Sequence, residues 1–279
     1  MKVRLCLAVQ LFLDLFSSCY SYTLPGIEDT QFIQDCVNAH NNFRSQVNPP
    51  ASNMLHMTWD SALAKTAKAW AKRCIFDHNV YLKIPGKVHP DFTPVGENIW
   101  TGSLSLFSVN AALKSWYDEV TNYNFETRNC IGKCGHYTQV VWATSYKVGC
   151  AVHLCPSVTG FKGLTNGAHF VCNYGPAGNY PMQPYKTGAA CSDCNGEKCV
   201  TTLCENPERE KLTSYSSWHP DWDTPPQPGR PGAPQLSSPR SSCDQYCIIV
   251  LIVRLLFVLL IFGAVLLVQW QYPQIFIYE

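Results

Sequence analysis

Gly135–Trp142 has the sequence GHYTQVVW, which is rich in residues that favour strands. Successive side chains of a strand point to opposite faces of a sheet, so alternate residues from His136 to Trp142 would share one face. Valine, tryptophan, tyrosine and threonine all favour strands. The stretch therefore predicts a half-buried strand over His136–Ala143. The histidine at its start is either held at the edge of the core by a hydrogen bond or part of a functional site.

Two more strands are predicted further along the chain, over Val148–Leu154 and His169–Tyr174. The segment between them, 156–167, is rich in turn-forming residues. We therefore expect these two strands to pair as an antiparallel hairpin.

Three helices are predicted before the strands, because apolar residues recur there at helical spacing. They cover Thr30–Arg44, Ser61–Cys74 and about 109–120. Asp60 and Ser108 stand directly before the second and third of them, and both residue types are good N-caps. Helices followed by an antiparallel sheet indicate an α+β domain.

The composition limits the class of protein. The 279 residues carry a net charge of +1, without the basic patch that nucleic-acid binding needs, so we expect no nucleic-acid partner. Fifteen cysteines in such a chain indicate an oxidising compartment.

The N-terminus has the pattern of a secretory signal peptide. Lys2 and Arg4 precede an apolar run, Leu5–Phe16, and small and polar residues follow it. We assign residues 1–21 to the signal peptide. An uncleaved anchor is the alternative, but the run is too short to span a bilayer comfortably.

A second apolar run, Ile248–Val268, has the length of one transmembrane helix and is interrupted only by Arg254. It predicts a single-pass membrane protein with its N-terminal domain in the lumen or outside the cell, and a short tail over 269–279. The tail contains no Lys or Arg, so the positive-inside rule does not support this orientation. A glycolipid-anchor signal is the alternative to a transmembrane helix, since the small residues Ser241 and Ser242 precede the run.

A cysteine-rich module over 186–205 and a proline-rich stalk over 206–247 separate the main domain from this run. Four cysteines of the module allow three disulfide connectivities: Cys191, Cys194, Cys199 and Cys204. A zinc knuckle is the rival interpretation, which the secretory context disfavours. Cys243 and Cys247 lie next to the membrane run, where they would pair with each other or link two chains.

The main domain has an odd number of cysteines, so one is free or pairs outside the domain. The seven are Cys36, Cys74, Cys130, Cys134, Cys150, Cys155 and Cys172.

Two long sequence motifs indicate a protein family. GHYTQVVW (135–142) and HFVCNYGPAGNY (169–180) resemble the two signatures of the CAP superfamily of cysteine-rich secretory, antigen 5 and pathogenesis-related proteins. The resemblance extends from about Thr30 to Tyr185. It implies an α-β-α sandwich over 22–185, with the cysteine-rich module as the hinge of the family.

The resemblance also implies a cleft with two histidines and two glutamates, which map onto His78, Glu97, Glu119 and His136. Imidazoles bind Zn²⁺, and carboxylates complete its coordination or hold a water. A divalent metal, Zn²⁺ in particular, is therefore the expected cofactor. The alternative is a buried polar network without metal, in which each glutamate bonds to a histidine.

Three functions follow as expectations. The favoured one is a non-enzymatic binding module, since members of the superfamily are associated with sterols, fatty acids and protein partners at cell surfaces. A metal-dependent or His/Glu-assisted hydrolase is the second, although the chain has no Gly-x-Ser-x-Gly elbow. A surface scaffold without a small-molecule ligand is the third.

Overall fold

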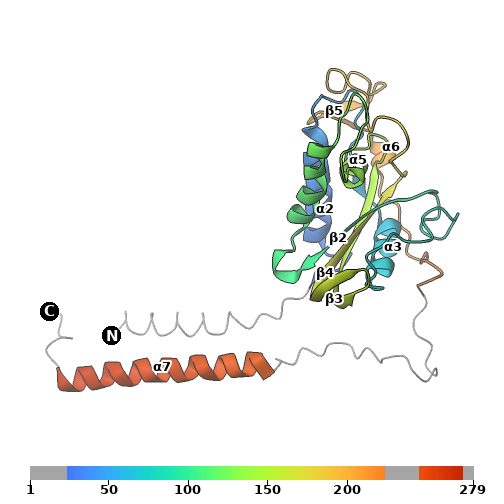
Figure 1. The fold of residues 1–279 in the computed structure, drawn as a ribbon. Helices are drawn as coiled ribbons and strands as arrows, with labels where there is room; N and C mark the ends of the chain where they lie inside the picture. Colours follow the sequence, from blue (N-terminus) through green and yellow to red (C-terminus); the bar gives the residue numbers. More distant parts are fainter. Residues whose placement is uncertain (1–23, 224–244, 273–279) are drawn as a thin grey trace, which may run out of the picture. The chain divides into compact units, whose positions relative to one another are not determined.

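The computed structural model describes residues 24–223 and 245–272 (Figure 1). The chain divides into two compact units, one formed by Leu24–Gln227 and the other by Met1–Thr23 with Pro228–Glu279. Each is described by itself. The predicted signal peptide, the tail beyond residue 272 and residues 224–244 of the predicted stalk lie outside the described residues.

A four-stranded sheet forms the centre of the larger unit, in the order β1-β3-β4-β2. β1 is parallel to β3, whereas β3–β4 and β4–β2 are antiparallel. Its strands are β1 (Thr58–Trp59), β2 (Gly96–Ser103), β3 (Lys147–Val158) and β4 (Phe161–Gly175).

The predicted hairpin is confirmed as β3 and β4, but both strands run further than the sequence indicates. Pairing continues through the segment expected to be a turn, with Ser157 opposite Thr165 and Val158 opposite Phe161. β2 was not predicted as a strand. It begins at Gly96 and pairs with β4 along its whole length.

The three predicted helices are confirmed as α2 (Thr30–Ser45), α3 (Ser61–Ala71) and α4 (Val109–Tyr117). The side chain of Asp60 accepts the N–H groups of the first turn of α3, and that of Ser108 does the same for α4. Short 3₁₀ turns adjoin α4 on both sides, η1 (Leu104–Leu106) before it and η2 (Asp118–Asn122) after it.

The sheet lies between helical layers, as the resemblance implies (Figure 1). On one face, Phe170 of β4 packs against Phe32 of α2 and Trp116 of α4. On the other face, Gly149 of β3 lies against the backbone of α3, where a Cβ would come within 2.1 Å of the Ala64 nitrogen. The α+β class is therefore confirmed.

Residues 135–140 form a helix, α5 (Gly135–Val140), so the predicted strand over His136–Ala143 is wrong. The same eight residues also suit a helix, because Tyr137, Val140 and Val141 recur at helical spacing and are buried. The Glu119 carboxylate accepts the backbone N–H groups of His136 and Tyr137, which a first helical turn leaves unpaired. Because Glu119 lies far from α5 in the sequence, the residue pattern of 135–142 gives no sign of this acceptor.

Arg44 fixes the end of α5 to α2. Its guanidinium is buried and donates to the carbonyls of Val140 at 2.9 Å, Trp142 at 2.7 Å and Ala143 at 3.1 Å. It also donates to the carbonyl of Leu55 at 2.6 Å. A buried charge is tolerated here because carbonyl oxygens surround it. Burial nevertheless lowers the pKa of Arg44 to about 9, although Tyr174 acts in the opposite direction.

Five disulfides occur in the described residues, and Cys36 is free and buried among them. This agrees with the odd number of cysteines in the domain. The pairs are Cys74–Cys155, Cys130–Cys134, Cys150–Cys172, Cys191–Cys199 and Cys194–Cys204. The cysteine-rich module is thus closed by its own two disulfides around the small hairpin β5 (Lys198–Val200) and β6 (Leu203–Glu205).

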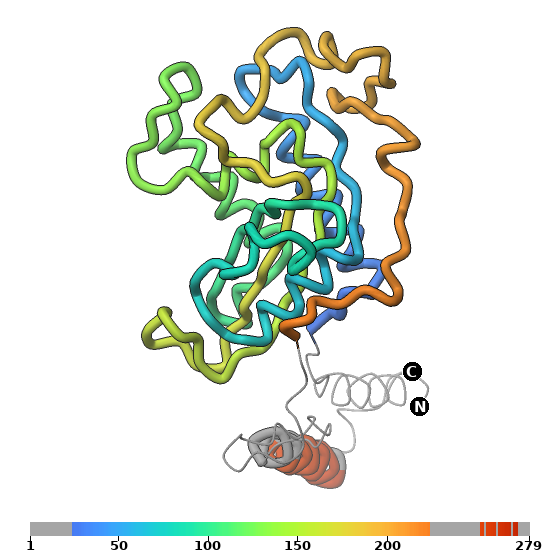
Figure 2. The backbone as a smooth tube through the Cα atoms, turned by 90° about the vertical axis from the view of Figure 1, so that its right-hand side faces the viewer, coloured from blue at the N-terminus to red at the C-terminus, as the bar shows by residue number. Residues whose placement is uncertain are grey.

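The segment that follows this module packs onto the domain, although the sequence assigns it to the stalk. After α6 (Pro207–Glu210), residues 211–223, here called the clasp, run back along the outside of the domain (Figure 2). Lys65 of α3 donates to the carbonyls of Tyr215 and Trp218. Trp222 stacks on Tyr81 at 5.1 Å between ring centroids.

The second unit contributes helix α7 (Gln245–Gln271), which includes the predicted transmembrane segment 248–268. Crossing a bilayer takes about 20 predominantly apolar residues in one helix. Over the two described ranges, no helix combines the length and apolar character that this requires. The structure therefore does not support the predicted transmembrane helix.

Candidate functional site

The four residues implied by the resemblance form two histidine–glutamate pairs. His78 lies in the loop after α3, and its Nδ1 is 3.0 Å from Oε1 of Glu97 on β2. The His78 side chain is 60% exposed, whereas the Glu97 side chain is completely buried. The pair therefore presents an imidazole to solvent on top of a buried carboxylate.

The Glu97 carboxylate is held from two further directions. Its Oε1 accepts the backbone N–H of Asn79 at 2.9 Å, and its Oε2 accepts Nδ2 of Asn173 at 3.2 Å. Asn173 lies opposite Glu97 on β4. These donors satisfy a carboxylate that would otherwise be costly to bury.

The second pair joins η2 to α5. Nδ1 of His136 lies 2.6 Å from Oε1 of Glu119, and the His136 backbone N–H donates to Oε2 at 3.0 Å. The imidazole also lies parallel to the indole of Trp116, with 6.1 Å between ring centroids. The side chains of His136 and Glu119 are 26% and 12% exposed. The ring of His136 is therefore fixed in both position and orientation.

One member of each pair has a shifted pKa. The hydrogen bond with Glu97 raises the pKa of His78, against a smaller opposing effect of burial. Burial raises the pKa of Glu119, but its hydrogen bond with His136, the charge of that ring and two backbone N–H groups lower it, and the net shift is downward.

Asn98 connects the two pairs. It follows Glu97 on β2, and its Nδ2 donates to the carbonyl of His136 at 3.0 Å. The same Nδ2 lies 3.3 Å from the hydroxyl of Tyr174. Because successive residues of a strand point to opposite sides, β2 presents Glu97 to one pair and Asn98 to the other.

The metal-binding capacity of this arrangement rests on the ring nitrogens that remain. Each histidine uses Nδ1 for a glutamate, and within the described part of the chain neither Nε2 makes a protein hydrogen bond. Among the same residues, no three His, Cys, Asp or Glu side chains form a group that would hold a metal ion. Each carboxylate is thus engaged by Nδ1 of its histidine, which leaves Nε2 as the free ring nitrogen of each pair.

Two buried polar atoms near Glu97 lack a partner. They are Nδ2 of Asn79 and Oδ1 of Asn173. Buried polar groups are normally hydrogen-bonded, so each is a candidate contact for water or a ligand. One unused hydrogen-bond donor and one unused acceptor therefore lie beside the first pair.

Sequence reasoning did not find the three asparagines of the site, Asn79, Asn98 and Asn173. The signal was present, since Asn98 precedes the apolar pair Ile99-Trp100 and Asn173 follows the apolar run 170–172. A buried strand accepts an amide only where it finds partners. The contacts of Asn173 with Glu97 and of Asn98 with the His136 carbonyl depend on the tertiary fold, which the sequence alone does not provide.

Comparisons with known proteins agree with this architecture. The family model described as "Cysteine-rich secretory protein family" (CAP) matches residues 37–174. Glioma pathogenesis-related protein 1 of Mus musculus is 53% identical over 225 residues, which are 80% of this chain and 84% of that protein. GLIPR1-like protein 1 of Homo sapiens is 49% identical over 190 residues, which are 67% of this chain and 77% of that protein.

Solved structures share the fold. "Crystal structure of NaASP2 with Zn2+" has a TM-score of 0.51 and 29% identity, and the match covers 67% of this chain and 100% of that one. "Crystal Structure of Na-ASP-1" has the same TM-score at 28% identity, with 67% of this chain and 50% of that one covered.

Proposed function

Because the chain belongs to the CAP family of cysteine-rich secretory proteins, we propose that it is a binding protein whose two histidine–glutamate pairs form a site for a divalent metal ion. The metal would be held by His78 and His136 through Nε2. Glu97 and Glu119 would orient the rings.

The observation that carries this proposal is the use of Nδ1 in both pairs. A histidine that binds a metal commonly donates its other ring N–H to a carboxylate, which fixes the tautomer and makes the free nitrogen a better ligand. His78 and His136 both have this arrangement. Two imidazoles leave coordination positions for water or for a ligand of the protein.

The solved structure "NaASP2 with Zn2+" supports Zn²⁺ as the ion, since that protein has the same fold at 29% identity. The donor set points the same way. Imidazole nitrogen suits Zn²⁺, whereas Ca²⁺ and Mg²⁺ prefer oxygen ligands. When bound, Zn²⁺ would polarise a ligand oxygen or the water beside it.

Binding is favoured over hydrolysis by the surroundings of the two rings. Within the described residues, no Ser or Cys side chain forms a hydrogen bond with His78 or His136, so neither ring is paired with a side-chain nucleophile. An activated water remains the one route to a hydrolase. Turnover that His136→Ala abolishes in a folded protein would establish that route.

The compartment and the partners are part of the proposal. Five disulfides favour an oxidising compartment. A sterol, a fatty acid or a cell-surface protein is the ligand that the family resemblance suggests. Attachment to a membrane stays a prediction from the sequence.

The test is a calorimetric titration of the full chain with ZnCl₂. We expect one Zn²⁺ to bind with micromolar or tighter affinity, and His78→Ala with His136→Ala to abolish binding. The matched control replaces two histidines outside the pairs, His56→Ala with His219→Ala, and retains binding. Equal binding by the wild type and the first double variant would refute the site.

A second measurement separates loss of the site from loss of the fold. Thermal unfolding of each variant is followed with and without ZnCl₂, because a ligand that binds the native state raises its unfolding temperature. We expect Zn²⁺ to raise it for the wild type and the control. The His78→Ala, His136→Ala protein should unfold cooperatively at a temperature that Zn²⁺ leaves unchanged.

A further inference from the structure

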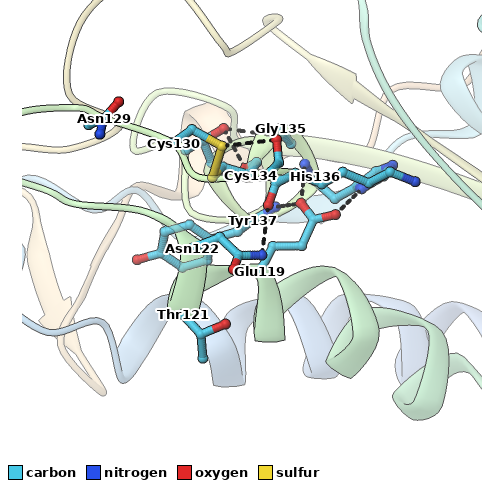
Figure 3. The surroundings of a disulfide bond; sticks show 12 residues. Glu119, Thr121, Asn122, Asn129, Cys130, Cys134, Gly135, His136 and Tyr137 are labelled. Atoms are coloured by element: carbon cyan, nitrogen blue, oxygen red, sulfur yellow. Dashed lines mark hydrogen bonds and ion pairs between the residues drawn. A yellow bond between two sulfur atoms is a disulfide. The ribbon is translucent and has the colours of Figure 1, made fainter.

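The disulfide Cys130–Cys134 lies beside the second histidine–glutamate pair (Figure 3). It closes the short ring CIGKC in the loop that leads from η2 to α5. Cys130 is exposed and Cys134 is buried, and both cysteines line a surface cavity of about 510 Å³. An attacking thiol can therefore approach this bond from outside the folded domain.

The other disulfides differ in burial or in the length of chain that they close. Cys150–Cys172 is completely buried, and Cys74–Cys155 and Cys194–Cys204 each include a cysteine with no exposed surface. Cys191–Cys199 also includes an exposed cysteine, but it closes the cysteine-rich module. Cys130 and Cys134 are four positions apart, the shortest separation of the five. A short ring restricts the unfolded chain least, so the fold depends least on this bond.

The ring contacts both elements that carry the second pair. On the η2 side, the backbone carbonyl of Asn122 accepts the N–H of Ile131 at 2.9 Å, and the side-chain Nδ2 of Asn122 donates to the Lys133 carbonyl. On the α5 side, the Cys134 carbonyl accepts the N–H of Thr138 at 3.0 Å. Glu119 and His136 are thus held together by their own contacts and by the closed ring between them.

We propose that Cys130–Cys134 is a thiol–disulfide exchange site for a protein dithiol of the Cys-x-x-Cys type, and that its opening loosens the Glu119–His136 pair. This goes beyond the proposed metal site and does not depend on it. The geometry that carries it is the accessible bond in the segment between the two residues of the pair.

The reaction is a two-electron exchange. A thiolate of the partner attacks Sγ of the exposed Cys130, the bond between the two sulfurs breaks, and Cys134 leaves as a thiolate that takes up a proton. The second thiol of the partner then attacks the mixed disulfide and releases Cys130. The chain gains two electrons and two protons, and the partner is left with a disulfide.

The first arm of the test measures exchange in the full chain. The protein is incubated with a reduced thioredoxin-type dithiol, quenched at intervals with an alkylating agent and mapped by peptide mass spectrometry. We expect Cys130 and Cys134 to be alkylated about tenfold faster than the other disulfide cysteines. Opening of Cys191–Cys199 at the same rate, or opening of all five pairs together, would overturn the exchange site.

The second arm measures the coupling. The N–H groups of His136 and Tyr137 donate to Glu119, so their hydrogen exchange reports whether the pair is intact. We expect Cys130→Ser with Cys134→Ser to accelerate exchange at these two amides about tenfold, and the matched control, Cys191→Ser with Cys199→Ser, to leave it unchanged. Unchanged exchange in the first variant would refute the coupling. If that variant does not fold, the partially reduced wild type from the first arm serves instead.

Discussion

Glu119 binds His136 twice, through the imidazole Nδ1 at 2.6 Å and through the backbone N–H at 3.0 Å. One carboxylate therefore both orients a candidate ligand and caps the short helix that carries it. Because the Glu119 side chain makes both contacts, a change in its charge should alter both the orientation of the His136 ring and the stability of α5.

Acid should weaken this contact. The folded-state pKa of Glu119 lies below the ordinary 4.5, since the contacts with His136 outweigh burial. The contact therefore stabilises the fold above pH 4.5 and is lost as pH falls through the lower, folded-state value. We expect Glu119→Gln to reduce the free energy of unfolding by about 1–3 kcal/mol at pH 7 and by less at pH 3.

Urea unfolding of wild type and variant at both pH values checks this prediction. Glu126→Gln, in the exposed loop that follows η2, serves as the control and should leave the free energy of unfolding at pH 7 unchanged. An equal loss for Glu119→Gln at the two pH values would contradict the electrostatic explanation.

Removing the Arg44 guanidinium should be among the most destabilising single changes. Arg44→Met would leave the carbonyls of Leu55, Val140, Trp142 and Ala143 buried without their donor. We expect a loss of about 3–5 kcal/mol in unfolding free energy. Arg44→Lys keeps the charge but offers a single nitrogen, so its unfolding free energy should lie between those of the wild type and Arg44→Met. Urea unfolding checks this prediction. A loss under about 1 kcal/mol for Arg44→Met, which is the scale of one net hydrogen bond, would show that water replaces the guanidinium.

The close approach of β3 to α3 gives a steric prediction. A Cβ at position 149 would lie 2.1 Å from the Ala64 nitrogen and 2.6 Å from the Asp60 carbonyl oxygen, and backbone has little room to move. We expect Gly149→Ala to cost about 3 kcal/mol of unfolding free energy. Gly26→Ala, with nothing within 4 Å of its Cβ, is the control and should be close to neutral. Similar unfolding temperatures for the two variants would disprove the contact.

Buried histidines should make the domain sensitive to mild acid. Burial lowers the pKa of His40 to about 4, although its contact with the Cys36 carbonyl opposes this shift. The unfolded chain takes up a proton near pH 6.5, whereas the folded chain does not until about pH 4, so stability falls as pH falls between these values. From pH 7 to pH 5 this residue alone should reduce the unfolding free energy by about 2 kcal/mol.

Burial also lowers the pKa of His169 to about 4, with a further contribution from His153, so its effect has the same sign. His40→Gln keeps a polar group near the Tyr174 hydroxyl but does not titrate in this range. Its unfolding free energy should therefore depend less steeply on pH between 7 and 5. An unchanged slope would show that His40 is not the residue responsible.

The sequence was sufficient for the elements whose signals are local. Asp60 and Ser108 mark the starts of α3 and α4 because an N-cap acts on the next three residues. It was insufficient for α5, because Glu119 caps it from seventeen positions away. β2 was missed for the same reason, since pairing with β4 and not its own pattern defines it as a strand.

For the site, the residue types could be predicted, and two arrangements were open. His78, Glu97, Glu119 and His136 were expected as one set of metal ligands or as a network in which each glutamate bonds to a histidine. The structure has the two histidine–glutamate pairs of the second arrangement, and the metal stays a prediction. Which atom of each ring faces a carboxylate depends on backbone positions fixed by the whole fold. The disulfide partners were likewise open, because spacing does not determine which cysteines meet.

The clasp has a consequence for how the domain is completed during synthesis. Trp222 fills a position between the loop after α3 and the surface of that helix, more than a hundred residues after both have been made. The loop after α3 therefore lacks this contact until residues 211–223 have been synthesised. A fragment that ends at the last cysteine of the module, Cys204, would contain every disulfide of the domain and still lack its closing contact.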